Sequence, residues 1–333
     1  LMRTYALAAV DSKPEDRAEW WDRAHRVAID FPQPGAASPF GLLVHFEDAR
    51  VGIDQAAVGR ADPPRRPTTD RSAAGPLPVL RTALRALDQL DAALAARRRR
   101  LGRNRPLDEG LSREEIDALQ RHVASQASRA LRIQGQSYAA GTPDRANSVQ
   151  RALERLTTLA ELPVADGLVW RSRVDQVACY RLLGKDAKAA QVATRLLDSD
   201  PPPEIADAVR AQRIRAELAS RQIDRAAAAA EAAATTTGRD AADLELARLE
   251  AKIAAWRRAK GPADTETTTR LAKRAADQVQ RIRQRHSPYW AQQAETMLAR
   301  ELASGTVDLG ALKRAAQMLY QGGQTTEAEA AYD

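Results

Sequence analysis

The side chains of this chain that could bind a metal or act as nucleophiles are few and widely separated. Its four histidines form no HExxH pair; they are His25, His45, His122 and His286. His45 opens the segment HFED, which also contains Glu47 and Asp48. On a helix these three side chains point in different directions, so the segment predicts a polar surface rather than a metal site.

Cys179 is the only cysteine, which excludes a disulfide within the chain and a thiolate metal cluster. It lies in the apolar helical stripe RVDQVACYRLLG, which predicts a buried structural thiol rather than a nucleophile. The following LLGKDAK shares only a Gly-Lys pair with phosphate-binding loops. Cys179 stands at the upstream glycine position and Asp186 at the Ser/Thr position, so the phosphate cradle is absent. We therefore predict no catalytic site, no cofactor and no metal in this span.

The composition predicts an all-α protein. Ala, Leu and Arg dominate the 333 residues, aromatic residues make up 4%, and no run of alternating β-branched residues is present. Pro and Gly fall between the apolar-periodic stretches, where helices are expected to end. The chain contains no run of about 18 apolar residues, so the sequence predicts no transmembrane helix in this span.

A formal net charge of +7 could indicate an anionic partner such as nucleic acid. Seven of the 51 basic residues are Lys and the rest are Arg, a bias that a GC-rich genome also produces. The densest cluster is a candidate phosphate-binding patch of Arg97, Arg98, Arg99, Arg100, Arg103 and Arg105. Cations at a helix C-terminus also complement its dipole, and no aromatic residue interleaves to stack on bases, which favours the structural interpretation.

Apolar periodicity divides the chain into segments. Residues 1–60 form an N-terminal helical block, with one helix over 12–30 that Ser12, Glu15 and Pro14 would start, and another over 39–58. Residues 61–78 are Pro-rich and predict a linker or long loop. Residues 79–161 predict helical hairpins, with helices over 79–101, 113–134 and 143–161, the second started by Ser112 and Glu115 and the third by Thr142 and Pro143.

From residue 165 to 333 the sequence predicts a train of helices with short turns. The expected helices cover residues 166–183, 186–198, 204–219, 222–236, 240–259, 264–286, 288–303 and 308–321. Such a train indicates stacked hairpins and prompts a search for a repeat.

The segment LKRAAQMLYQGGQTTEAEAAY resembles a tetratricopeptide repeat. The residues at the large, small and turn positions of that family are Leu312, Ala316, Leu319, Gly323, Ala328 and Tyr332. Small residues at such spacing let two antiparallel helices approach closely. A second match places Tyr180 on the first helix, Gly184 at the turn and Ala189 on the second helix, although Val177 and Arg173 depart from the pattern.

A third, weaker match has Arg221 where the turn glycine should be. The resemblance implies an irregular α-α superhelix of stacked antiparallel hairpins. Gly323 follows Gly184 by 139 positions, close to four repeats of about 34. Four repeats require seven intervening helices where six are predicted, so either two helices are joined within 264–286 or one repeat is irregular.

The candidate partner-binding residues are Arg281, Arg285, Tyr289 and Trp290, because aromatic and Arg clusters are typical of binding hot spots. Alternatively, Ser287 and Pro288 start a helix whose residues Trp290, Ala294, Met297 and Leu298 pack inward. The chain has two Asn, which argues against the Asn- and Lys-based carboxylate clamp of chaperone-binding repeats, although Arg can bind carboxylates bidentately.

The leading hypothesis is a non-catalytic scaffold that binds a protein or peptide, with preference for an acidic one, on a solenoid surface. The alternative is Arg-mediated binding of nucleic acid or another polyanion, and the third is an enzyme whose catalytic parts lie outside this span. We expect the chain to be a fragment of a larger multidomain protein, truncated within its last repeat. We expect it in the cytoplasm, with an upstream export signal left open.

Overall fold

The computed structural model describes residues 1–31, 38–61, 75–101, 111–163, 167–234, 241–259 and 265–303. Contacts divide the chain into two compact units, Leu1–Leu183 and Gly184–Asp333. In the ranges given above, every regular element is a helix and none is a strand. The expected all-α fold of stacked helix hairpins is therefore confirmed. The division falls at residue 183, inside the segment 165–333 that the sequence suggests is one array.

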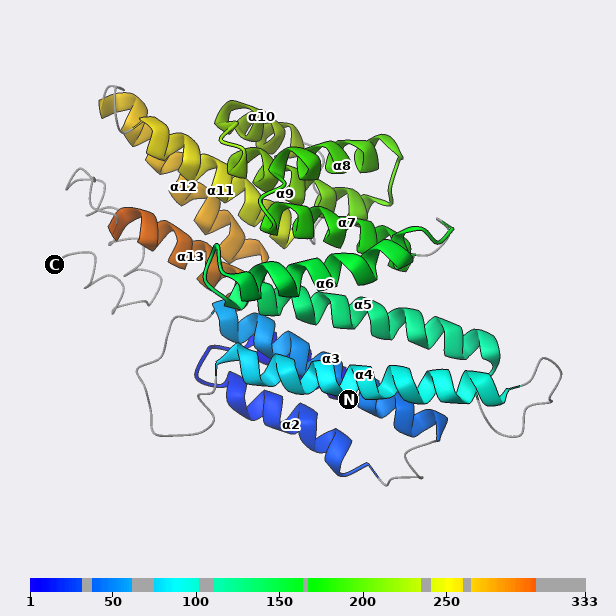
Figure 1. Ribbon diagram of the computed structural model, residues 1–333. Coiled ribbons are helices and arrows are strands. Elements are labelled where there is room, and N and C mark those ends of the chain that lie inside the picture. Colours follow the sequence, from blue (N-terminus) through cyan, green and yellow to red (C-terminus); the bar gives the residue numbers. More distant parts are fainter. Residues whose placement is uncertain are drawn as a thin grey trace. The chain divides into compact units, whose positions relative to one another are not determined.

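Unit 1 is a succession of helices in which each packs on the next. From α3 onward, neighbours in sequence are neighbours in space, and α1 and α2 both pack on α3. The helices, which Figure 1 shows, are α1 (Met2–Asp11), α2 (Arg17–Ile29), α3 (Pro39–Ala61), α4 (Pro76–Arg100), α5 (Arg113–Ser137), α6 (Pro143–Ala160) and α7 (Gly167–Leu182). The core of α3, α4 and α5 is made mainly of Leu, Ile and Ala side chains, with Leu80, Leu87 and Ile116 fully buried.

In unit 2 the hairpins pack around two central helices, α9 and α11. Helix α9 contacts α8, α10 and α11, while α11 contacts α9, α10, α12 and α13. The helices are α8 (Asp186–Asp198), α9 (Pro203–Ala219), α10 (Ile223–Ala234), α11 (Ala242–Ala259), α12 (Thr265–Arg285) and α13 (Pro288–Ala303). Because α12 is one continuous helix, no two helices are joined within 264–286.

The N-terminal block differs from the prediction. The helix expected over 12–30 is shorter, and a helix that was not predicted, α1, precedes it. Ser12 ends α1 instead of starting a helix, because its hydroxyl donates to the Ala8 carbonyl at 2.6 Å. Helix α2 starts only at Arg17, after Asp16. Trp21 and Ala24 of α2 are buried, and Trp20 is half-buried.

Other helix starts agree with the sequence. Ser112 and Glu115 form a reciprocal capping box, with Glu115 N–H donating to the Ser112 hydroxyl at 3.1 Å and Ser112 N–H to the Glu115 carboxylate at 2.7 Å. The Thr142 hydroxyl accepts from Arg145 N–H at 3.4 Å, and Pro143 occupies the first turn of α6. These contacts satisfy N–H groups that the helix itself leaves without partners.

Glycine is required at one position inside α5. A Cβ added at Gly135 would lie 2.5 Å from the Val149 side chain and 3.3 Å from the Arg145 carbonyl, both on α6. The close approach of α5 and α6 therefore depends on the missing side chain. Cys179 of α7 is fully buried next to the same pair of helices, and burial raises the pKa of its thiol to about 12. The predicted buried structural thiol is confirmed.

Helix α9 ends in a Schellman motif built around Arg221. The N–H of Arg221 donates to the Leu218 carbonyl at 2.9 Å, and the N–H of Gln222 donates to the Glu217 carbonyl at 2.8 Å. Arg221 has φ +59°, so it adopts the left-handed conformation that the tetratricopeptide pattern assigns to glycine. Gly184, at the corresponding place after α7, has φ +71°. Helices α7 and α8, which the sequence pairs around Gly184, belong to different units, and the best-matched repeat, 312–332, lies outside the described residues.

Replacing Arg221 with glycine should stabilise unit 2 by about 0.5–1 kcal/mol, because glycine adopts positive φ without the cost that a Cβ imposes. Urea denaturation followed by circular dichroism measures this effect. Ala228→Gly, at an exposed position inside α10, is the matched control and should destabilise by about 0.5–1 kcal/mol. Equal effects of the two substitutions would contradict the role assigned to the backbone at Arg221.

The packing of α2 on α3 should weaken as pH rises. His25 Nδ1 lies 2.7 Å from the Asp48 carboxylate, and His25 Nε2 lies 3.2 Å from the Gln55 side-chain oxygen. The hydrogen bond to Asp48, opposed by burial and helped by the charges of Asp48 and Asp22, raises the pKa of His25. A raised pKa means that the stabilisation is complete below about pH 6.5, the ordinary value, and is lost as pH rises through the folded-state pKa.

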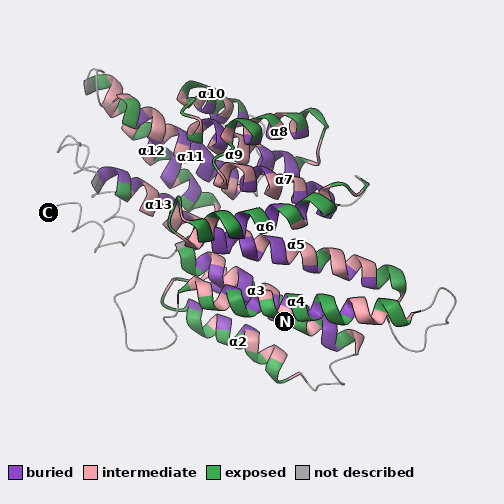
Figure 2. Cartoon of the chain, in the orientation of Figure 1, coloured by how far each residue is buried: buried purple, intermediate pink, exposed green. Residues whose placement is uncertain are grey.

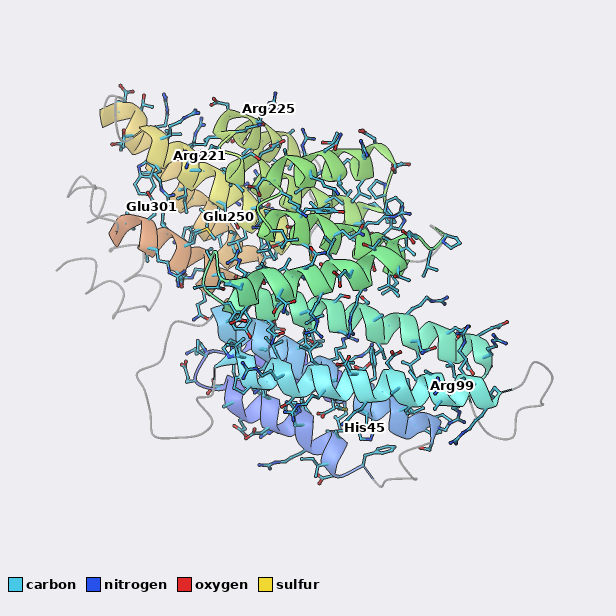
Figure 3. The ribbon with its side chains drawn as sticks, in the orientation of Figure 1. His45, Arg99, Arg221, Arg225, Glu250 and Glu301 are labelled. Carbon is cyan, nitrogen blue, oxygen red and sulfur yellow. The ribbon has the colours of Figure 1, made fainter. Side chains whose placement is uncertain are left out.

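Because the pair is partly exposed, the stability that the native chain loses through His25 as pH rises should be less than about 1 kcal/mol. We expect His25→Asn to remove this loss. The measurement is the urea midpoint at pH 6 and pH 8 for the native chain, His25→Asn and the control His45→Asn, whose side chain is exposed on α3 (Figure 3). A His25→Asn midpoint that falls with pH as steeply as the native one would exclude this linkage.

Candidate interaction surface on helices α12 and α13

The helices that present the candidate residues are fixed by buried charges on α11. Arg248 and Glu245 are 2% and 3% exposed. Arg248 Nη1 donates to both carboxylate oxygens of Glu245 at 3.0 and 3.1 Å, and its Nε donates to the Ala230 carbonyl of α10 at 3.1 Å. Burying this pair is tolerable only because both partners are hydrogen-bonded.

Gln278 of α12 completes the same cluster. Its side-chain amide donates to the Glu245 backbone carbonyl at 3.3 Å and to the Glu245 carboxylate, and its oxygen accepts from Lys252 Nζ at 2.8 Å. Gln278 is 1% exposed, so this polar contact fixes which side of α12 faces α11. Burial, followed by repulsion from Arg248 and Arg281, lowers the pKa of Lys252.

A second arginine, Arg215, is largely buried and joins α9 to α11; 11% of its side chain is exposed. Arg215 donates from Nε to Glu250 at 2.9 Å and from Nη1 to the Asp243 carboxylate at 2.9 Å (Figure 3 labels Glu250). Burial alone would lower the pKa of Arg215, but the two carboxylates raise it well above its usual value. The guanidinium therefore stays charged and holds α11 against α9.

Apolar side chains pack α12 and α13 against α11. The shared core consists of Leu246, Leu249, Ile253, Trp256, Ala275, Val279, Ile282, Ala294, Leu298 and Leu302. At the far end, Arg257 Nε of α11 donates to the Glu301 carboxylate of α13 at 3.0 Å. Glu301 is 4% exposed, so α13 is tied to α11 by an ion pair as well as by apolar contacts.

The outward side of α12 is basic. Arg281 and Arg285, the predicted partner-binding arginines, are both exposed, as is Arg283 (Figure 2 shows the exposed face of α12). Arg281 and Arg285 are four residues apart and therefore lie on one side of the helix. Their side chains are available to a partner without disturbing the core.

The predicted aromatic pair lies at the start of α13. The rings of Tyr289 and Trp290 are 5.1 Å apart in a T-shaped arrangement, and both side chains are half-buried. Trp290 packs on the core of α11, α12 and α13, and Ala294 and Leu298 are buried, as the inward-packing alternative expects. The pair thus contributes to the hairpin and also leaves part of its ring surface accessible at the start of α13, where Tyr289 follows Arg285 by four positions in the sequence.

The arginine cluster at the end of α4 has a structural component. Arg98 pairs with Asp117 of α5 at 2.7 Å, and Arg97 to Arg100 all lie in the last turn of α4, where cations complement the helix dipole. Arg99 and Arg100 are exposed (Figure 3 labels Arg99). The other two members of the predicted patch, Arg103 and Arg105, lie outside the described residues.

The residues of HFED join helices. Glu47 accepts from Arg3 Nε of α1 at 2.8 Å, and Asp48 pairs with His25 of α2. In the described part of the chain, no group of three or more His, Cys, Asp or Glu side chains is placed to hold a metal ion. Among the same residues, no helix has the length and apolar character needed to span a membrane.

Comparison with known proteins identifies no family. No protein-family model and no curated protein matches the chain. Among solved structures, the human IFIT1 dimer with PPP-AAAA matches with 15% sequence identity and a TM-score of 0.40, covering 95% of this chain and 67% of that one. At this score and identity, nothing about ligand or mechanism is carried over.

The sequence prediction missed the basic residues in the first half of α12. Arg270, Lys273 and Arg274 are exposed on the same side as Arg281. The available signal was the recurrence of cations at i, i+4 and i+11 along the helix predicted over 264–286. The predicted aromatic pair drew attention only to the turn that follows this helix.

Removing one member of the buried pair should be costly. Arg248→Met leaves the Glu245 carboxylate buried with Gln278 as its main donor, and we expect unit 2 to lose about 3–5 kcal/mol of stability. The double variant Arg248→Met/Glu245→Met removes both charges and should recover most of the loss. Urea denaturation followed by tryptophan fluorescence reports on this region, because Trp256 lies in the adjacent core.

Arg258→Met is the control, since Arg258 pairs with Asp224 at an exposed site and should matter little. A double variant as unstable as Arg248→Met alone would show that the cost comes from lost packing of Arg248 and not from an unpaired charge.

Proposed function

We propose that this chain is a non-catalytic, tetratricopeptide-like helical scaffold that binds a protein partner on the outer surface of the α12–α13 hairpin. The observation that carries the proposal is that exposed Arg281 and Arg285 lie toward the end of α12, and the half-buried Tyr289–Trp290 pair starts α13, on a hairpin fixed by buried charges. Rigid presentation lowers the entropic cost of binding, because the surface needs no reordering when the partner arrives.

The chemistry of this surface favours an acidic protein. Arg binds carboxylates through paired N–H donors, and aromatic rings supply apolar contact area at low conformational cost. Three carboxylates at buried or half-buried sites serve structural pairs: Glu245 with Arg248, Asp243 with Arg215, and Asp48 with His25. These carboxylates stabilise the helices, which supports a binding role rather than an enzymatic one.

The left-handed endings at Gly184 and Arg221 support the resemblance to tetratricopeptide repeats. Both follow a helix, and at Arg221 the chain reverses from α9 into α10, which packs against it, as at turn positions of that family. The resemblance remains a proposal, and the binding test below does not depend on it.

Affinity capture with the purified chain tests the function. The native chain, the charge-reversal variant Arg281→Glu/Arg285→Glu and the control Arg99→Glu/Arg100→Glu serve as baits after nuclease treatment. The two variants change the charge equally and at exposed sites. We expect protein partners that the native chain and the α4 control retain and that the α12 variant loses.

Three results would contradict the proposal. Equal capture by all three baits would mean that α12 is not the binding surface. Capture that disappears with nuclease, or that only the α4 variant loses, would favour the polyanion-binding alternative at Arg99 and Arg100, whose affinity should fall steeply with salt.

A further inference from the structure

The basic face of α12 extends beyond the last turn of the helix. We call the α12 basic stripe the set of exposed cations Arg270, Lys273, Arg274, Arg281 and Arg285. At 100° per residue these side chains fall within about a third of the helix circumference, opposite the buried Ala275, Val279 and Ile282. From Arg270 to Arg285 the stripe is about 22 Å long, at 1.5 Å rise per residue.

Several arginines elsewhere in unit 2 form ion pairs within the unit, whereas these do not. Arg215 pairs with Asp243 and Glu250, Arg257 with Glu301, and Arg258 with Asp224. Within the described residues, no carboxylate forms an ion pair with any member of the α12 basic stripe. The stripe therefore presents charge that the described residues of unit 2 leave unneutralised.

The helix dipole explains only part of this pattern. A cation at Arg285 is favourable, because it lies in the last turn, where the dipole is negative. Arg270, Lys273 and Arg274 lie in the N-terminal half, where the dipole offers no such gain, and they repel one another. An anionic ligand that neutralises both halves would remove this repulsion.

One acidic residue interrupts the stripe. Asp277 is exposed between Arg274 and Arg281, on the same side of α12. A nucleic acid strand presents a negative charge at each phosphate and would meet Asp277 with repulsion, and the stripe carries no aromatic side chain for base stacking. A polypeptide can instead place carboxylates on either side and a neutral or cationic residue opposite Asp277.

On the basis of the proposed function, we infer that the partner is an acidic polypeptide segment that lies along α12. Its carboxylates form two clusters, one at Arg270, Lys273 and Arg274 and the other at Arg281 and Arg285. A lysine or neutral residue separates the clusters and faces Asp277. The Tyr289–Trp290 pair follows the second cluster and marks the end of this charge-based contact.

Two labelled nonapeptides test this arrangement by fluorescence anisotropy at low salt. The uniform peptide consists of glutamate alone; the split peptide has a central lysine between two equal runs of glutamate and therefore less net negative charge. Each extended nonapeptide spans about 30 Å, enough to cover the stripe. The native chain should bind the split peptide about threefold more tightly than the uniform peptide, although long-range attraction alone favours the uniform one. Asp277→Ala should reverse this preference.

Matched variants locate the contact. Arg270→Glu/Arg274→Glu should weaken binding of the split peptide at least tenfold, while the α4 control Arg99→Glu/Arg100→Glu should bind it as the native chain does. Circular dichroism and urea midpoints confirm that each variant is folded, and an oligothymidine nonamer serves as the nucleic-acid probe.

Several results would overturn the inference. Absence of peptide binding, tighter binding of the uniform peptide than of the split peptide by the native chain, or tighter binding of the oligothymidine than of both peptides each excludes it. If Arg281→Glu/Arg285→Glu abolishes peptide binding but Arg270→Glu/Arg274→Glu does not, the stripe is wrong and the proposed partner surface at the α12–α13 turn stands. If affinity capture shows no dependence on Arg281 and Arg285, the proposed function itself fails, whatever the peptides do.

Discussion

Arg248 and Arg215 place two guanidinium groups in the interior of unit 2, and this burial constrains the helices around them. A buried charge is tolerated only when its donors are matched, so α9, α10, α11 and α12 must keep the positions that bring Glu250, the Ala230 carbonyl, Glu245 and Gln278 to these groups. Apolar Ala and Leu contacts alone permit small rotations and shifts of one helix on another. The polar contacts do not, because a displacement of about 1 Å breaks them.

This constraint extends to the surface. Gln278, together with the buried Ala275, Val279 and Ile282, turns one side of α12 toward α11, and the α12 basic stripe then faces outward. A rotation of α12 by one residue, about 100°, would carry Gln278 away from Glu245 and bring exposed cations toward the core. The same contact that completes the buried cluster therefore determines which residues of α12 a partner can meet.

Much of the fold could be predicted from the sequence, since caps and apolar periodicity are local. The helices at 113, 143, 186 and 288 start at the predicted residues, and Ser112 and Thr142 cap two of them. Local signals failed at Ser12, whose hydroxyl bonds backward to Ala8 although the Ser-x-x-Glu spacing favours a start. They also gave no indication of Gly135, whose role depends on Val149 of the facing helix. Long-range contacts of this kind leave no mark in a single sequence.

The functions of the arginines were the hardest to predict, because one side chain type serves three purposes here. Arg248 in LARLEAK has the same neighbours in sequence, Ala, Leu and Glu, as many exposed helical arginines, yet it is 2% exposed. Arg221 acts through its backbone: it adopts φ +59° at a turn position where glycine is the usual residue. Only after the buried and paired arginines are assigned does the remainder become informative: in unit 2 the cations of the α12 basic stripe collect on one side of the helix, with Asp277 between them. An overall charge of +7 does not reveal such a pattern, because it counts neutralised and free cations alike.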